Sequence, residues 1–409
     1  MGIYRDLGRN PGVFRVLFSQ LTARFPHGML SIILLLHLQH QYGEYTAAGI
    51  VLAAVSVGQA AAGPLTSRLI GHLGMRPVIA VTSFVCAALV AVIAFVHLPL
   101  VATAILGFAA GLAFPPITPA VRTVYPRIVP SNQLSALFSL DAAAQELIWV
   151  AGPVIAVFVS AQFGTTEGLV LAAAIMVAGG AWFLSSPVLG QIKVPKSRSS
   201  LGAVLRRPTV VITTIIGFFF VASFAALEAG IVRAFAPVGS GDAHGSIESG
   251  IVLGVFAAGS LVGGLVIGHR TIRPWSLFIR ILIVLAGTAA CLVSLNMWWL
   301  SIVLFLGGIG TAPTFAAISS MIGATVKFSE TAEAFGWIGT GQLVGVAIGS
   351  ALGGVAIDAF GANGAIVVST GLLVIAGLIA ATTTRWMPDL TGIEIEQPPE
   401  TGTIAIPLP

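Results

Sequence analysis

The octet "IGHLGMRP" at Ile70–Pro77 returns as "IGHRTIRP" at Ile267–Pro274, 197 residues later in a chain of 409. Five of the eight positions are identical, and each copy lies between two long apolar stretches. A short polar sequence that recurs half a chain apart in the same surroundings indicates duplication. The octet therefore predicts two related halves, each with the same turn between two long helices.

The composition is that of a membrane-embedded chain. Hydrophobic residues make up 56% of it, charged residues only 8%, and the mean hydropathy is +1.00. Soluble proteins carry about 25% charged residues, and a soluble chain this apolar would expose more hydrophobic surface than water tolerates. We predict an all-helical protein that crosses the membrane many times.

The motifs of several other protein classes are missing from the sequence. Its basic residues form no contiguous stripe, which argues against nucleic-acid binding. Cys86 and Cys291 lie inside apolar stretches, where we expect buried hydrophobes and no disulfide. No zinc or haem spacing and no hydrolase or metalloprotease motif occurs in the apolar stretches. We predict no catalytic residues, no metal and no cofactor.

Twelve stretches are long enough to cross a bilayer, which takes about 20 mostly apolar residues. They lie at 14–40, 46–70, 77–97, 99–125, 133–162, 165–188, 209–235, 248–268, 274–296, 298–325, 331–358 and 363–386. We expect a six-helix half at 1–190, a cytoplasmic linker at 191–208, a second six-helix half at 209–387, and a disordered cytoplasmic tail at 388–409.

The distribution of Lys and Arg predicts the topology, because these residues favour the cytoplasmic side of short loops. Basic residues occupy alternate connections: Arg5, Arg9, Arg68, Arg76, Arg127, Lys193, Lys196, Arg198, Arg206, Arg207, Arg270, Arg273, Lys327 and Arg385. The intervening connections at 41–45, 97–99, 162–168 and 359–364 contain none. We expect a multi-pass protein of the cytoplasmic membrane with both termini inside the cell.

The repeat extends beyond the octets. "GLAFPP" at 111–116 is echoed by "GTAPTF" at 310–315, and Gln145 by Gln342, again 197 residues apart. Duplicated halves of this kind face each other across a central cleft and suit alternating access. We expect the prolines at 115–119 and Pro313 to interrupt the helices of spans 4 and 10.

The repeated loop resembles the signature loop of the major facilitator superfamily, which reads Gly, three residues, Asp-Arg, any residue, Gly, then two basic residues. The first copy keeps Gly74 and Arg76, and the second keeps Arg273. Gly71–His72 and Gly268–His269 stand where Asp-Arg is expected, so the charge-based latch of this loop is weakened. The resemblance implies twelve helices in two pseudo-symmetric halves and secondary transport of a small molecule, without enzymatic activity.

Span 5 narrows the resemblance. "AGP" at 151–153 resembles a remnant of the Gly-Pro motif of proton-coupled antiporters, although Ile148, Ala156 and Val157 replace its other glycines. The stretches at 23–29 and 136–153 are similar to an uncharacterised bacterial branch of the superfamily. The remnant favours proton-coupled efflux.

Ionisable residues inside spans are costly, so each is a functional candidate. Arg24 lies about 15 Å deep in span 1, and Glu146 lies at a comparable depth in span 5. We predict that they pair, either as a proton switch that frees Arg24 for an anionic group or as a structural ion pair. His27, three residues from Arg24, shares its helix face and either relays a proton or only donates a hydrogen bond.

Further charges lie nearer the membrane surfaces. We predict that Asp141 and Arg122 pair at the inner mouth of the cavity, as a gate or as a permanent bridge between spans 4 and 5. Glu228 in span 7 is a third acidic candidate, with an interfacial pair to Arg233 as the alternative. Arg280 is expected to extend to the cytoplasmic surface. The positions of the second half that match Asp141 and Gln145 are uncharged, namely Ile338 or Gly339 and Gln342, which concentrates proton coupling in the first half.

The remaining candidates line the predicted cavity: Gln145, Gln342, Phe114, Phe224 and Phe315. The scarcity of polar residues there favours an amphipathic or drug-like substrate over a sugar. Gly341, Gly345, Gly349 and Gly353 predict close helix packing along span 11. A proton symporter that imports a sugar, nucleoside or organic acid stays open, as does a transport-inactive sensor or scaffold. We expect a monomer whose partners are the substrate, protons and membrane lipid.

Overall fold

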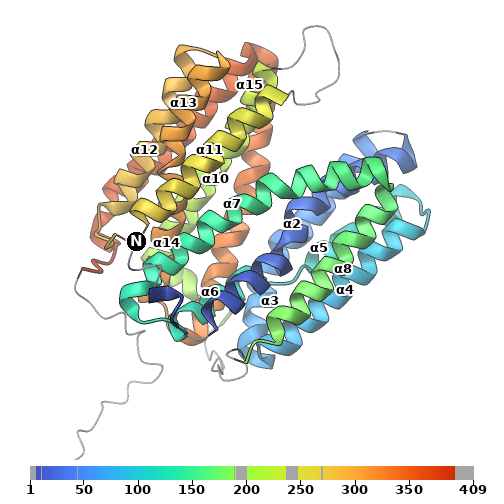
Figure 1. The fold of residues 1–409 in the computed structure, drawn as a ribbon, viewed down its shortest axis with the longest axis horizontal. Helices are drawn as coiled ribbons and strands as arrows, with labels where there is room; N and C mark the ends of the chain where they lie inside the picture. The colour runs from blue at the N-terminus through green and yellow to red at the C-terminus, as the bar shows by residue number, and fades with distance from the viewer. Residues whose placement is uncertain are drawn as a thin grey trace, which may run out of the picture.

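The computed structural model describes residues 6–10, 12–43, 45–187, 189, 200–235, 247–268 and 270–391. Within them all regular structure is helical, in two groups of helices that Figure 1 shows tilted against each other. His269 and most of the predicted linker and tail lie outside the described residues.

The N-terminal half contains α2 (Val13–Tyr42), α3 (Tyr45–Leu73), α4 (Met75–Phe95), α5 (Leu100–Leu112) with α6 (Ile117–Val124), α7 (Ser131–Gln162) and α8 (Thr165–Leu184). The C-terminal half contains α10 (Pro208–Ala234), α11 (Ile247–Ile267), α12 (Ser276–Ala290), α13 (Met297–Gly308) with α14 (Thr311–Thr325), and α15 (Phe328–Thr382).

The expected twelve spans are confirmed. Eleven described helical segments are long and apolar enough to cross a membrane. One of them, α15, has 55 residues, which at about 1.5 Å per residue is roughly 80 Å, far more than a hydrocarbon layer of about 30 Å. Its backbone leaves the helical region at Gly361, with φ 65° and ψ −158°, so α15 comprises two spans. Positive φ of this kind favours glycine, which has no Cβ to clash.

Spans 4 and 10 are both interrupted. Between α5 and α6 lies the segment 113–116, where Pro115 and Pro116 have no N–H for the helical ladder, as the sequence predicts. In span 10 the interruption lies at 309–310, before Pro313. Pro313 instead occupies the first turn of α14, where its missing N–H breaks no helical bond. The interruption of span 10 therefore precedes the proline that the sequence pointed to.

The predicted close packing along span 11 is also confirmed. A Cβ at Gly349 or Gly345 would overlap the backbone carbonyl oxygens of Ala222 or Phe218 in α10. In the N-terminal half, α2 and α7 approach each other in the same way at Gly28 and Gly152. Small residues let these backbones touch, which is how apolar helices associate in lipid. Cys86 and Cys291 are buried and unpaired, as expected.

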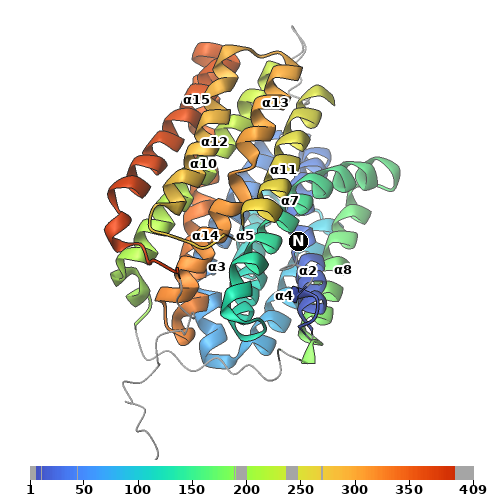
Figure 2. The ribbon, with the colours of Figure 1, turned by 60° about the vertical axis from the view of Figure 1, so that its left-hand side comes forward.

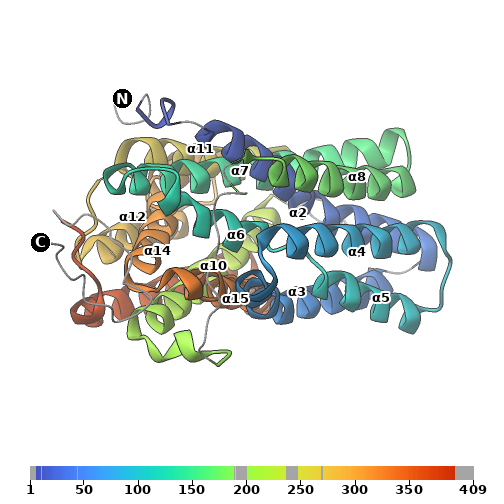
Figure 3. The ribbon, with the colours of Figure 1, turned by 90° about the horizontal axis from the view of Figure 1, so that it is seen from below.

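The two halves touch at one end of the molecule. There α3 packs against α15, and α7 packs against α11 and α14. We call this the closed end; it includes the loops at 74, 127–130 and 326–327. The opposite, open end carries the loops at 96–99, 163–164 and 294–296, and the helix groups diverge toward it (Figures 1 and 2). Figure 3, seen from the closed end, has α3, α6 and α7 meeting the C-terminal half.

Candidate functional site

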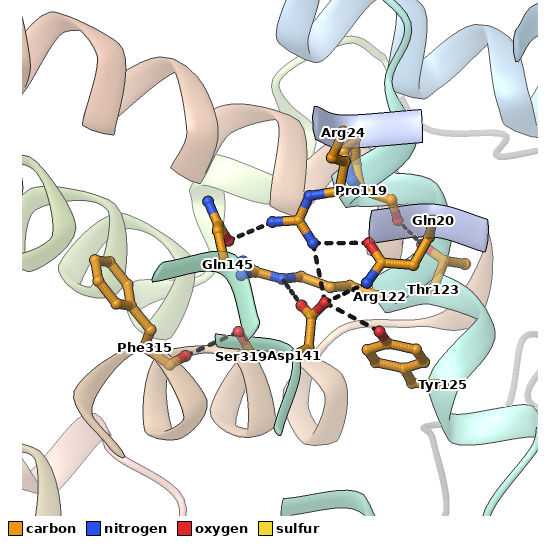
Figure 4. A network of polar contacts seen from close by, with 10 residues as sticks. All are labelled: Gln20, Arg24, Pro119, Arg122, Thr123, Tyr125, Asp141, Gln145, Phe315 and Ser319. Carbon is orange, nitrogen blue, oxygen red and sulfur yellow. Dashed lines mark hydrogen bonds and ion pairs between the residues drawn. The ribbon is translucent and has the colours of Figure 1, made fainter. Parts of the chain in front are cut away.

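Polar side chains from α2, α6, the 3-10 turn Tyr125–Arg127 and α7 meet inside the N-terminal half, beside α14 and α15 of the other half. We call this group the Asp141 cluster (Figure 4); it consists of Gln20, Arg24, Arg122, Tyr125, Asp141 and Gln145. Helical spacing explains its composition, because residues four apart lie on one helix face. Gln20 and Arg24 share a face of α2, and Asp141 and Gln145 share a face of α7.

Asp141 lies at the centre of the cluster and is fully buried. Its Oδ1 accepts hydrogen bonds from Arg24 Nη1 at 2.9 Å, Gln20 Nε2 at 2.9 Å and the Tyr125 hydroxyl at 3.1 Å. Arg24 also donates to Gln20 Oε1 at 2.8 Å and to Gln145 Oε1. The Arg24 guanidinium therefore spans α2 and α7 and has several acceptors.

Arg122 is held differently. Its Nε lies 3.6 Å from Asp141 Oδ2, an ion pair without a hydrogen bond. Its guanidinium lies over the ring of Phe335 in α15, 5.6 Å from the ring centroid. Arg24 and Arg122 are only 6% and 7% exposed, so two guanidiniums share one carboxylate in a region of low dielectric. Such buried charges are costly unless they are well paired.

The predicted pair of Asp141 with Arg122 is confirmed, whereas the described partner of Arg24 differs from the expected one. The sequence prediction pairs Arg24 with Glu146, but the carboxylate at its guanidinium is Asp141. Depth along a span does not give the direction of a side chain, and Asp141 shares its helix face with Gln145. The side chain of Glu146 lies outside the described residues, so its own role stays a prediction.

His27 lies one turn further toward the open end. Its ring lies 5.1 Å from each of the rings of Phe114 and Trp149, in edge-to-face contacts. No hydrogen bond joins its imidazole to the Asp141 cluster among the described side chains. The geometry gives His27 an aromatic setting and provides no described proton path from it to Asp141.

The other cavity candidates come from the C-terminal half. Phe224 and Phe315 both pack against Phe220, with ring centroids 4.7 and 5.4 Å apart. Gln342 is half-buried, and its Nε2 lies next to Gly217 without a hydrogen bond to a described residue. Phe220, Phe224 and Phe315 thus form an apolar group in the C-terminal half, whereas the Asp141 cluster of the N-terminal half is charged.

Two charged residues of this half differ from expectation. Glu228 is exposed, and no ion pair joins it to Arg233 in the described part of the chain. Arg280 does not extend to the surface: it is 4% exposed and donates from Nη1 to the Pro313 carbonyl oxygen at 2.6 Å. This carbonyl lies in the first turn of α14, after the interruption of span 10.

A second polar contact, which the sequence analysis did not predict, joins the halves at the closed end. Arg68 Nη1 lies 3.7 Å from Glu333 Oε2, and the Gly202 N–H donates to Glu333 Oε1 at 2.7 Å. Thr340 Oγ1 donates to the Ala60 carbonyl oxygen at 2.7 Å across the same surface. We call this contact between α3 and α15 the charged seam. In the sequence Arg68 serves only as a topology signal, so its pairing with Glu333 across the halves is not predicted.

The octets lie next to the surfaces where the halves meet. In the first copy Gly74, with φ 91°, forms the turn before α4, while His72 and Arg76 are exposed. Arg76 Nη2 donates to the Ser186 carbonyl oxygen at 3.5 Å. In the second copy the Gly268 carbonyl accepts from Ser135 Oγ at 2.8 Å. Arg273 is exposed, and its N–H donates to Ser276 Oγ at 2.9 Å.

The fold and the buried charges define a polytopic membrane transporter built from two related six-helix halves. The Major Facilitator Superfamily profile matches residues 16–295 and 218–389. The chain belongs to this superfamily; it is a secondary transporter of a small-molecule substrate and not an enzyme.

Individual relatives agree with this assignment. The chain is 27% identical over 281 residues to the uncharacterized MFS-type transporter y4rN of Sinorhizobium fredii, covering 65% of this chain and 68% of that protein. It is 26% identical over 267 residues to the transcription regulatory protein OpdE of Pseudomonas aeruginosa, covering 63% and 65%. The crystal structure of the human organic anion transporter MFSD10 superposes with a TM-score of 0.67 at 15% identity, covering 90% and 98%.

Proposed function

We propose that the protein couples transport of a small organic molecule to protons, and that Asp141 is the proton-binding group. The observation that carries this proposal is the burial of the Asp141 carboxylate between two arginines. A proton on Asp141 removes the charge that holds Arg24 and Arg122 in place. The cluster then changes its contacts, and because Arg122 touches Phe335 of α15, the change reaches the opposite half.

We assign the closed end to the cytoplasmic side. The described basic residues Arg68, Arg76, Arg127, Arg206, Arg207, Arg270, Arg273, Lys327 and Arg385 lie at this end, as the preference for cytoplasmic Lys and Arg favours. The arrangement then corresponds to an outward-facing state of an alternating-access cycle. Arg24 and Gln145 lie on the side of the Asp141 cluster toward the open end, because both follow their partners by one turn in helices that run outward.

The direction of transport has two candidates. The Gly-Pro remnant at 151–153 and the apolar lining with Phe224 and Phe315 favour proton-coupled export of an amphipathic or drug-like molecule. The excess of buried arginine over carboxylate favours proton symport of an organic acid instead. A transport-inactive sensor is the candidate of another class, to which the name of the relative OpdE lends support.

Transport into vesicles tests the proposal. Proton flux is measured with a pH-sensitive dye in proteoliposomes while candidate substrates are added on one side. We expect substrate-driven proton flux in the wild type and none in Asp141→Asn. Asp389→Asn, in the exposed segment after α15, is the matched control and should behave as wild type. Unchanged proton coupling in Asp141→Asn would refute the role of Asp141.

Two further measurements separate the candidates. Opposite movement of proton and substrate in oriented vesicles means export by exchange, and movement together means symport. Absence of flux for every compound that binds would favour the sensor. Glu146→Gln, measured in parallel, tests whether the neighbouring carboxylate shares the proton.

A further inference from the structure

Arg122 has an incompletely satisfied charge. It is 7% exposed, yet its Nε has no hydrogen bond to a described residue, and its only described carboxylate is the 3.6 Å contact with Asp141 Oδ2. The other carboxylate oxygen of Asp141 accepts hydrogen bonds from Arg24, Gln20 and Tyr125. A buried arginine usually forms bidentate bonds to a carboxylate. Among the described residues, Arg122 therefore has no carboxylate within hydrogen-bond distance.

The charge of the cluster limits what can bind there. Its described side chains carry two positive charges and one negative charge, a net charge of +1. Protonation of Asp141 alone would leave two buried guanidiniums without a counter-charge, which is strongly unfavourable. An anion that arrives together with the proton returns the net charge to +1 and supplies the acceptor for Arg122. The binding of the proton and the binding of the anion therefore favour each other.

The surroundings of Arg122 indicate the rest of the ligand. Phe335 lies against its guanidinium, and the rings of Phe315 and Phe220 pack on the same side of the interface, in the C-terminal half. The half-buried Gln145, bonded to Arg24, lies toward the open end. A ligand that enters from the open end would meet cationic groups on one side and aromatic side chains on the other.

We propose that the substrate is an organic monoanion with an apolar body, that Arg122 binds its acidic group with the help of Arg24, and that it is transported together with the proton on Asp141. Asp141 fills the place of the anion in the unoccupied transporter. This inference rests on the proposed proton role of Asp141, and it favours symport over export by exchange.

Thermal stability of the purified protein tests the anion. The probes are a panel of aromatic and branched aliphatic carboxylates, each with its neutral amide and its amine of the same shape. We expect carboxylates to raise the melting temperature and their amides and amines to have no effect. Arg122→Gln should weaken the binding of the effective carboxylates at least tenfold. Arg273→Gln, which replaces an exposed arginine, should leave their binding unchanged. Stabilisation by amides or amines, or by no carboxylate, would overturn the proposal.

Two controls protect the interpretation. The melting temperature without ligand reports whether Arg122→Gln is folded, and Arg122→Lys keeps the charge but loses the planar fork, so it should bind with intermediate affinity. If Arg122→Gln is unfolded, the comparison of Arg122→Lys with wild type decides, and equal affinities overturn the role of Arg122.

The pH dependence distinguishes this inference from the proton proposal. Sulfonates of the same shape as the effective carboxylates stay ionised throughout, so their binding reports only on the protein. We expect sulfonates to bind more tightly as the pH falls in the wild type and independently of pH in Asp141→Asn. If the wild type binds anions through Arg122 independently of pH, the proposal of proton coupling is refuted and the anion site is supported. If transport is coupled to protons but binding shows no preference for anions, the anion site is refuted and the proton proposal is supported.

Discussion

Removal of the Glu333 charge should open the closed end of the transporter. Glu333 is 2% exposed and contacts Arg68 of the other half at 3.7 Å and the Gly202 N–H at 2.7 Å. In Glu333→Gln the amide oxygen keeps the Gly202 bond in weaker form, and the ion pair is lost. Loss of one partner of a fully buried ion pair costs about 3–5 kcal/mol, whereas an exposed pair is worth about 0–1 kcal/mol.

The expected magnitude lies between these two limits. The Arg68 side chain is 21% exposed, so it can turn to water after the substitution, which reduces the loss. We expect about 1.4 kcal/mol, which is a tenfold change in the ratio of the two conformations. The reference for this change is the arrangement seen here, with the halves in contact at the charged seam.

Distances between spin labels at the open end report this ratio. Labels at Phe163→Cys and Val293→Cys, which are exposed positions in opposite halves, are introduced after Cys86 and Cys291 are replaced by Ala. We expect the population with a short distance between labels to increase about tenfold relative to the long-distance population in Glu333→Gln.

The matched control is Glu330→Gln. Glu330 lies one turn before Glu333 in α15 and pairs with Arg207 at 3.2 Å, next to α10 of its own half. Its loss should leave the ratio unchanged because that pair does not cross the charged seam. Equal distance distributions in the two variants would show that the Arg68–Glu333 pair does not hold the halves together, and the reasoning would fail.

Two glycine substitutions test the packing. Gly63→Val should also shift the labels toward the short distance, because a Cβ there would lie 2.7 Å from Thr340 Oγ1 and 2.9 Å from the Gly336 carbonyl oxygen. Gly49→Val, with open space around it, is the control and should not shift them. A wild-type distance distribution for Gly63→Val would contradict the close approach of the two helices. Gly349→Val should lower the melting temperature because its Cβ would overlap α10, and an overpacked site costs about 1–3 kcal/mol of folding stability. Gly354→Val, with no neighbour within 4 Å, is the control. An equal drop in melting temperature in the two variants would count against the helix contact as the cause.

The sequence predicts the fold well because the bilayer imposes a requirement that composition alone reveals. Each span needs about 20 apolar residues, and the breaks near Pro115 and Gly361 are local features. The partner of Arg24 was harder to predict. Asp141 and Glu146 differ by five positions, about 140° around a helix of 3.6 residues per turn, and depth says nothing about this angle. The position of a residue along a span determines its depth in the membrane, whereas the packing of the helices determines where its side chain points.

Helix packing also decides the contact of Arg280, which the sequence does not predict. Near the end of a span, a long side chain is free to reach the surface only if no acceptor lies closer. The Pro313 carbonyl of α14 lies 2.6 Å from its guanidinium, and this contact depends on how α12 packs against α14. The contact of Arg68 with Glu333 is equally hidden in the sequence, because 265 residues separate the two charges.

The duplicated halves meet at two surfaces that are related by the repeat but differ in strength. Ser67 faces Gly336 where α3 meets α15, and 197 positions away Gly264 faces Ser139 where α11 meets α7. The positions that correspond to Arg68 and Glu333 are Leu265 and Ala136, so the second surface has no counterpart of the ion pair. Its helix α7 carries Asp141. A charge change at Asp141 therefore acts on the helix that is less strongly held, and we expect the contact of α7 with α11 to separate before the charged seam does.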